Sequence, residues 1–224
     1  MFIRLCCVGA VLAGLALDAA AKPIAFADGT TVMAEYGADT MIEAQAFYAP
    51  RHRLSYGLGH LQLDSAIDAT ERRITYGRLN WLAKRWNLPA AQANVFLWGG
   101  AGAARTETSP TQRLAWNAGG QFDYETRRVY ASLKTDYHYS AGGGPGDVGS
   151  FSNRIDTLQL GLAPYEHEYG DLATWFVAQA RRYTGGIDNG TEVAILLRVF
   201  KRGTWLEAGA TTDGKVQAML MFNF

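Results

Sequence analysis

Cysteine, net charge and long hydrophobic runs are all scarce in this sequence. Its two cysteines, Cys6 and Cys7, lie near the start, so the rest of the chain must fold through packing and hydrogen bonds without disulfides. The 21 basic and 21 acidic residues cancel, which gives no electrostatic reason to bind nucleic acid. Beyond the N-terminal segment no run approaches the roughly 18 apolar residues of a transmembrane helix, and this excludes helical membrane proteins.

The N-terminal segment has the layout of a signal peptide. Arg4 provides a short basic start, residues 5–17 are apolar, and Ala19, Ala20 and Ala21 are the small residues that a signal peptidase requires. We predict a signal peptide at 1–21, cleaved after about Ala21, although a retained anchor or a buried helix would use the same residues. The remainder, 22–224, is 224 − 21 = 203 residues long, which suits one domain.

Alternation of apolar and polar residues runs along the whole chain, as in strands with one apolar face. In "RLAWNAGGQFDY", residues 113–124, every second residue is apolar or small, and "RVYASLKTDYHY" at 128–139 repeats the pattern. About twelve such segments can be counted, near 30–37, 41–48, 53–63, 72–84, 92–104, 112–124, 128–140, 154–163, 172–183, 191–200, 204–211 and 215–224. Most are longer than the usual five or six residues of a soluble strand, and suit tilted strands that cross a membrane.

The connections between these segments also alternate in character. Polar, glycine-rich stretches such as "DSAIDATE", "AGGGPGDVGSFSN" and "TGGIDNG" take turns with stretches such as "APRH", "ETR" and "KRG". If the strands run up and down, each set lies at one end of the sheet. Longer loops at one end and short turns at the other are typical of an outer-membrane barrel. Aromatic residues near the strand ends, among them Phe47, Trp116, Tyr183 and Trp205, predict two interfacial belts.

The chain ends on "KVQAMLMFNF", with apolar residues at every second position up to Phe224. This tail resembles the C-terminal signature of Gram-negative outer-membrane β-barrel proteins. The resemblance implies that Leu220, Phe222 and Phe224 form the signal read by the barrel-assembly machinery, that the last strand pairs with the first, and that the exterior contacts outer-membrane lipid and lipopolysaccharide. An exported soluble barrel or sandwich is the competing interpretation, but it would not need Phe224.

We therefore predict an all-β protein, a closed antiparallel up-and-down transmembrane β-barrel of about 12 strands (10–12), in the outer membrane. Such a barrel encloses more room than eight strands and less than sixteen. The polar faces carry slightly more cations than anions. The residues expected to line the lumen are Arg113, Asp123, Arg128, Lys134, Asp136, Gln179, Arg181, Glu192, Arg198 and Glu207.

Two roles for such a barrel stay open. A narrow channel would pass small polar solutes, with basic and acidic rows setting its charge selectivity. A structural barrel would instead be plugged by ion pairs across the lumen. No cofactor is expected for either role.

An enzyme and a metal-related barrel are weaker alternatives. His138 and Ser140 resemble the His-x-Ser element of the outer-membrane lipid A 3-O-deacylase family, in which a His is base to a Ser nucleophile. Departures are Ala141, where that family has Asn, and Asp156, where it has Glu. "GLAPY" at 161–165 is similar to a segment of copper-resistance barrels, and Met219 and Met221 would face the lumen as thioethers suited to Cu(I). We predict that the chain is not an enzyme.

Overall fold

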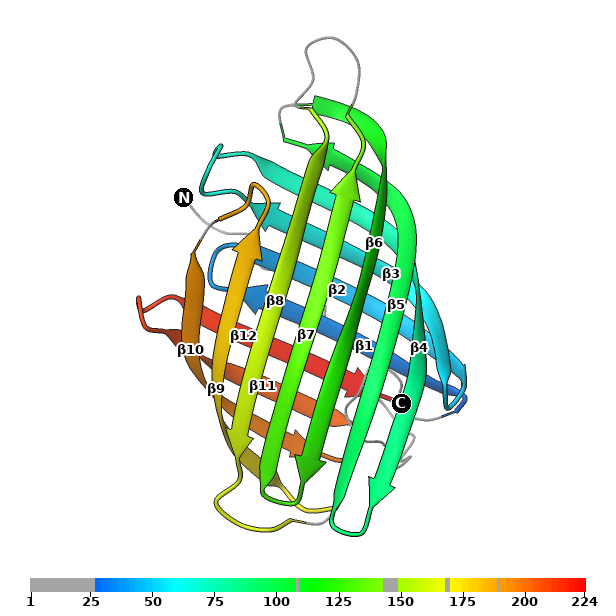
Figure 1. Ribbon diagram of the computed structural model, residues 1–224, viewed down its shortest axis with the longest axis vertical. Coiled ribbons are helices and arrows are strands. Elements are labelled where there is room, and N and C mark those ends of the chain that lie inside the picture. Colours follow the sequence, from blue (N-terminus) through cyan, green and yellow to red (C-terminus); the bar gives the residue numbers. More distant parts are fainter. Residues whose placement is uncertain (1–26, 108, 143–148, 168–169, 189) are drawn as a thin grey trace, which may run out of the picture.

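The computed structural model describes residues 27–107, 109–142, 149–167, 170–188 and 190–224, and these form twelve strands (Figure 1). The predicted signal peptide, 1–21, lies outside the described residues, as does most of the glycine-rich stretch 142–149. The strands are β1 (Gly29–Gly37), β2 (Met41–Arg51), β3 (Leu54–Asp64), β4 (Glu71–Leu88), β5 (Ala91–Thr106), β6 (Ser109–Thr126), β7 (Val129–Ser140), β8 (Phe151–Leu162), β9 (Ala173–Thr184), β10 (Thr191–Lys201), β11 (Thr204–Thr211) and β12 (Val216–Asn223).

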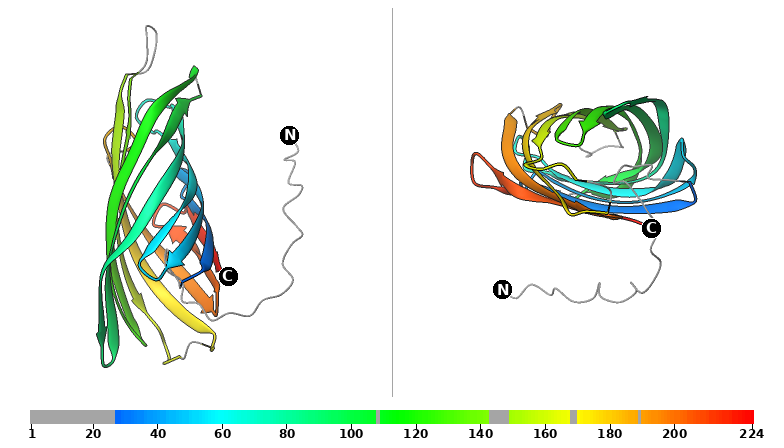
Figure 2. Two further views of the ribbon diagram at one scale, coloured as in Figure 1. Left: turned by 90° about the vertical axis from the view of Figure 1, so that its right-hand side faces the viewer. Right: turned by 90° about the horizontal axis from the view of Figure 1, so that it is seen from below.

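Each strand pairs antiparallel with its neighbours in sequence, and β1 closes the sheet by pairing with β12. The prediction of a closed up-and-down barrel of about twelve strands is confirmed. Its cross-section is flattened into an oval (Figure 2). Among the described residues, no helix is long and apolar enough to cross a membrane.

The two ends of the barrel differ in their connections. We call the loop end the one at which β1, β3, β5, β7, β9 and β11 finish. The turn end is the opposite one, where β1 begins and β12 finishes. Closure extends to the last residue there: Phe224 donates its backbone N–H to the carbonyl of Thr30 at 2.9 Å, and Thr30 donates back at 2.6 Å. These two bonds pair Phe224 with β1, so the strand edges at the seam are not free at this end of the barrel.

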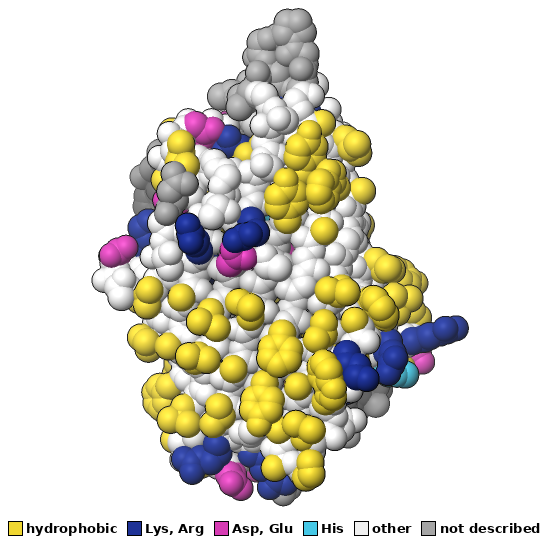
Figure 3. Space-filling view, viewed as in Figure 1, with side chains coloured by type: hydrophobic (Ala, Val, Ile, Leu, Met, Phe, Trp, Pro, Cys, Tyr) yellow, Lys and Arg dark blue, Asp and Glu magenta, His cyan; other side chains and the backbone are white. Residues whose placement is uncertain are grey.

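Apolar side chains cover much of the outside of the barrel, whereas among the described residues the inside holds most of the buried charged and amide side chains together with three hydrophobic clusters. Leu58 and Leu114 are each 68 % exposed and Ile195 is 62 % exposed, whereas Asn94 and Asp123 are fully buried. Hydrophobic side chains cover much of the face in Figure 3, which also carries a patch of basic and acidic side chains in its upper half. An exterior rich in large exposed apolar side chains around buried charges differs from a water-soluble protein, in which burial of apolar surface drives folding.

Exterior aromatic residues gather near both ends. Trp116 packs against Tyr137 and Tyr139 near the loop end, with ring centroids 5.2 and 5.7 Å apart, and Tyr48 packs against Tyr56 near the turn end at 6.0 Å. The belts are thinner than the sequence predicted. Phe47, Tyr183 and Trp205 point into the interior instead, because each occupies the inward position of its strand. Alternation alone determines the side on which an aromatic ring falls.

Candidate functional site: the barrel interior

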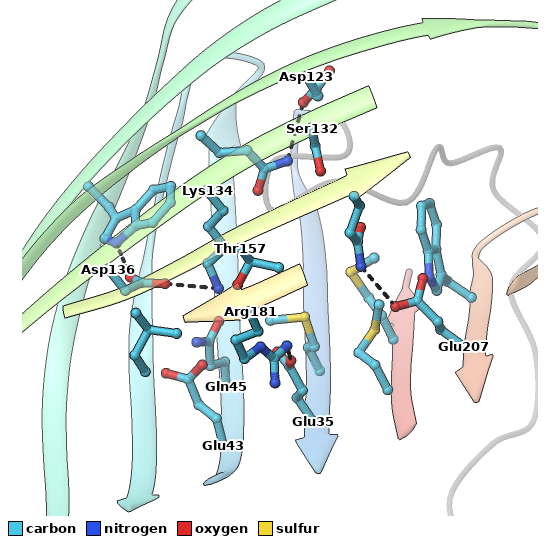
Figure 4. A pocket seen from close by; sticks show the side chains of 18 of the residues that line it. Glu35, Glu43, Gln45, Asp123, Ser132, Lys134, Asp136, Thr157, Arg181 and Glu207 are labelled. Atoms are coloured by element: carbon cyan, nitrogen blue, oxygen red, sulfur yellow. Dashed lines mark hydrogen bonds and ion pairs between the residues drawn. The ribbon is translucent and has the colours of Figure 1, made fainter. Parts of the chain in front are cut away.

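The interior holds a cavity of about 150 Å³ in the middle of the barrel. Figure 4 shows side chains from opposite walls converging on it, among them Glu43, Lys134 and Asp136. Its charged lining consists of Glu35, Glu43, Asp123, Glu125, Asp136 and Glu207 against Arg78, Lys134, Arg181 and Arg198. Six carboxylates and four cations leave a formal charge of −2 on the wall. The slight cationic excess expected from the sequence is therefore wrong for the cavity.

Seven of the ten residues expected to line the lumen do line this cavity: Asp123, Lys134, Asp136, Gln179, Arg181, Arg198 and Glu207. Glu192 faces inward above the cavity, where it accepts a hydrogen bond from Thr40 at 3.1 Å. Arg113 is also buried and lines a small pocket near the loop end.

Arg128 was predicted to line the lumen, and that prediction is wrong. It is exposed in the turn between β6 and β7, where its side chain donates to the carbonyls of Ala163 and Pro164, each at 3.3 Å. The alternation of β7 places position 128 on the inner side, but the strand begins at Val129 and the side chain reaches sideways along the rim.

Several residues on the first four strands line the cavity although the sequence did not predict them. Glu35, Glu43, Gln45 and Arg78 all line the cavity. The signal was present for two of them, because Glu43 and Gln45 alternate with the exterior Ile42 and Ala residues of β2. What the pattern could not show is that Glu43 shares one cavity with Lys134 and Asp136 of β7.

One ion network crosses the middle of the cavity. The guanidinium of Arg78 lies between the carboxylates of Glu43, at 3.8 Å, and Asp136, at 3.7 Å. Asp136 also pairs with the Lys134 ammonium at 2.9 Å and accepts a hydrogen bond from the indole of Trp98 at 2.7 Å. These contacts join β2, β4, β5 and β7. The network ties the two flattened walls together.

A second network lies toward the turn end. Arg198 donates from Nε to the Glu207 carboxylate at 2.6 Å and from its terminal nitrogen to Gln159 at 2.7 Å. The guanidinium lies over the rings of Tyr130 and Trp205, 4.4 and 4.3 Å from their centroids. Arg198 and Glu207 are almost fully buried, so each charge depends on the other. A separate pair, Arg181 with Glu35, lies above this network.

Above the cavity a hydrophobic cluster lies beside buried polar side chains such as Arg72, Arg113 and Asn153. A group of buried side chains, here called the apolar cap, fills the barrel beneath the loop end; it consists of Met41, Leu61, Leu63, Ile74, Tyr76, Ala104, Ala115, Phe151, Ile155, Tyr183 and Ile187. Ten of these belong to strands, whereas Ile187 comes from the connection between β9 and β10. Apolar side chains that narrow a lumen oppose the passage of ions and water.

The connection that carries Ile187 folds across the mouth of the barrel. Gly185 and Gly186 adopt φ of 80° and 97°, which turns the chain inward, and Ile187 is fully buried. Two hydrogen bonds hold the connection to the opposite wall: the Ser65 hydroxyl donates to the Gly186 carbonyl at 2.8 Å, and the Ala66 N–H donates to the Ile187 carbonyl at 2.9 Å.

The opposing β3–β4 connection is ordered by its own polar contacts. The Ser65 hydroxyl accepts the backbone N–H groups of Ile67 and Asp68, each at 3.2 Å. Arg72 donates to the carboxylate of Asp68. Hydrogen bonding to Arg72 lowers the pKa of the Asp68 carboxyl to about 2, so this contact persists over the ordinary pH range. The segment that carries Ile187 is therefore hydrogen-bonded to a β3–β4 connection that is itself ordered by polar contacts.

His138 and Ser140 do not form a nucleophile and base pair in this structure. Both face the interior, and neither ring nitrogen of His138 has a hydrogen-bond partner among the described residues. The Ser140 hydroxyl donates instead to the carbonyl of Ala141 at 3.4 Å. Asp156 lies on the exterior, where Thr135 donates to it at 2.7 Å. The barrel wall thus separates Asp156 from His138 and Ser140, unlike a catalytic triad.

Met219 and Met221 both line the cavity, as their alternation predicted. Among the described residues no group of three or more His, Cys, Asp or Glu side chains is arranged to hold a metal ion. No protein-family model, curated protein or solved structure matches the chain.

Proposed function

We propose that the protein is an outer-membrane β-barrel of a Gram-negative bacterium that forms a narrow passive channel for small polar solutes. The observation that carries this proposal is the inverted polarity of a closed barrel, with exposed leucines such as Leu58 and Leu114 outside and charged side chains within. In hydrocarbon every backbone group must be paired internally, and a closed barrel achieves this. The C-terminal residues Leu220, Phe222 and Phe224 would serve as the assembly signal.

In this proposal the cavity and the apolar cap have different tasks. The wall of ion pairs and amides offers hydrogen bonds to a polar solute, while the cap keeps the resting lumen closed. Ile187 is the cap residue best placed to move, because its segment joins two strands rather than forming part of one. Its displacement would require the loss of the hydrogen bonds to Ser65 and Ala66, and would leave the wall of the barrel intact.

A structural barrel without transport is the second candidate. It is favoured by the same cap and by the pairing of charges across the lumen, which includes Arg78 with Glu43 and Asp136. The two candidates differ in one property: whether the interior can open without loss of the fold.

Replacing Ile187 with alanine is expected to raise the conductance of the barrel. Truncation of a buried Ile to Ala removes about 2–5 kcal/mol of packing, and even one or two kcal/mol changes a two-state ratio by about 5- to 30-fold. The measurement is planar-bilayer conductance of refolded residues 22–224, a fragment that holds all twelve strands. We expect rare openings for the wild type and frequent openings for Ile187→Ala.

The matched control is Ile67→Ala. Ile67 lies in the neighbouring β3–β4 connection but is 54 % exposed and does not belong to the apolar cap. Its substitution should leave the open fraction at the wild-type level. If both variants and the wild type are inserted yet silent, the protein is a plugged structural barrel and the channel proposal is wrong.

The open channel is expected to prefer cations over anions, because its cavity wall carries two more carboxylates than cations. Lys134→Gln should increase this preference and Glu125→Gln should decrease it. Both residues line the cavity, and both substitutions remove one charge with little change in volume. The reversal potential across a potassium chloride gradient, measured in the Ile187→Ala background, gives the preference. Reversal potentials that move in the same direction for both variants would contradict a role of wall charge in selectivity.

A further inference from the structure

All four methionines that follow Met1 line the same cavity: Met33, Met41, Met219 and Met221. Three of them, Met33 on β1 with Met219 and Met221 on β12, form what is here called the methionine cluster. They lie on both sides of the seam that closes the barrel. Methionine is usually a packing residue surrounded by hydrocarbon, and the surroundings of this cluster are different.

The backbone register brings the three thioethers together. Met33 and Met221 are direct cross-strand partners, and Met219 lies two residues before Met221 on the same inward face. Diagonal partners on one face have Cβ atoms roughly 7–8 Å apart, within reach of long side chains. One ion can therefore contact more than one thioether. Glu35 and Glu207, both labelled in Figure 4, are the cross-strand partners of Met219 on either side.

Two carboxylates, each also paired with an arginine, flank Met219 of the cluster. Met219 is the cross-strand partner of Glu35 on one side and of Glu207 on the other, and Met33 is the partner of Gln45. The wall of the cavity has a formal charge of −2. A negative wall attracts cations, and thioethers select soft metal ions such as Cu(I) over hard ones. The seam thus places thioethers beside carboxylates, within a cavity whose wall has a net negative formal charge.

We propose that Met33, Met219 and Met221 form a binding site for a soft monovalent metal cation, Cu(I) or Ag(I), on the cavity wall. The site does not depend on whether the barrel conducts, so its test is independent of the channel proposal. The sequence pointed to Met219 and Met221 alone. The pairing of β1 with β12 adds Met33, which is the residue that turns a pair into a cluster.

The first test is a calorimetric titration of the refolded protein with Ag(I) in detergent and nitrate buffer. Silver needs no reductant, and Cys6 and Cys7 are absent from residues 22–224, so no thiolate competes. We expect one ion per chain. Metal-edge X-ray absorption should show sulfur in the first coordination shell, which separates thioether binding from binding to the four histidines.

Met33→Leu and Met221→Leu should each weaken binding by about tenfold or more, because even changes beside a metal ligand cost roughly 10- to 100-fold in affinity. The matched control is Met41→Leu. Met41 lines the same cavity but lies four residues from Gln45, the partner of Met33, which is roughly 13 Å along the strand. Its substitution should leave the affinity unchanged.

Leucine and methionine are similar in volume, so these variants should fold, and their folding is verified by the heat-dependent gel migration of intact barrels. No silver binding by the folded wild type would overturn the proposal. So would equal affinity for the wild type, Met33→Leu and Met221→Leu, or an absorption spectrum with nitrogen in place of sulfur.

Discussion

Replacing Glu207 with alanine is expected to lower the free energy of unfolding by about 3–5 kcal/mol. Glu207 is the ionic partner of Arg198, and both side chains are almost fully buried. Without Glu207 the guanidinium keeps its hydrogen bond to Gln159 and its two aromatic neighbours, but none of these carries a negative charge. An uncompensated buried charge is among the most costly changes that a single substitution can make. Urea titration of the barrel in lipid vesicles, with tryptophan fluorescence as the signal, measures the decrease in the free energy of unfolding.

Two further variants separate the cost of an orphaned charge from the value of the pair. The double substitution Arg198→Met with Glu207→Met removes both charges and should be far less destabilising than Glu207→Ala, because hydrophobic replacement of a buried pair is often neutral. Arg73→Ala breaks the more exposed pair between Arg73 and Glu71, which should cost less than about 1 kcal/mol. A double variant as unstable as Glu207→Ala would show that packing, not charge, governs this site.

Replacing Ile195 with arginine is expected to cost about 2–4 kcal/mol in a bilayer. Ile195 is near the middle of β10 and is 62 % exposed on the outside of the barrel. If that surface faces lipid, an arginine there must carry its charge into hydrocarbon. In a water-soluble barrel the same exposed substitution would change stability by no more than about 0.5 kcal/mol. The prediction therefore tests the membrane location directly, with the same urea titration.

The matched control is Thr204→Arg. Thr204 is exposed at the first position of β11, at the turn end. An arginine at an interface costs only about 0–1 kcal/mol, so a membrane barrel should show a clear difference between the two positions. Equal, small effects at both would contradict the outer-membrane proposal and favour an exported soluble barrel.

Much of the fold could be read from the chain because alternation acts locally. Each of the twelve predicted segments overlaps one observed strand, and the C-terminal alternation ending at Phe224 does pair with the first strand. The inward positions of β6, β7 and β9 were also predictable, and so Asp123, Asp136 and Arg181 lie where they were expected. The prediction for Arg128 was wrong because it extended the alternation beyond the strand, which begins at Val129, into the preceding turn.

The sequence could not show which residues face one another across the lumen. Alternation determines the side of the sheet on which a residue falls, but contacts across the lumen depend on register, strand tilt and the flattening of the barrel. These decide that Arg78 meets Asp136, and that Met33 lies beside Met221. The burial of Ile187 depends on a turn of two glycines and on hydrogen bonds to a connection more than a hundred residues away. The sequence alone determined an inverted, closed barrel, because the two-residue period is a property of each strand. Only the tertiary structure decided that its lumen is capped, acidic and lined with thioethers at the seam, because those features arise between strands that are distant along the chain.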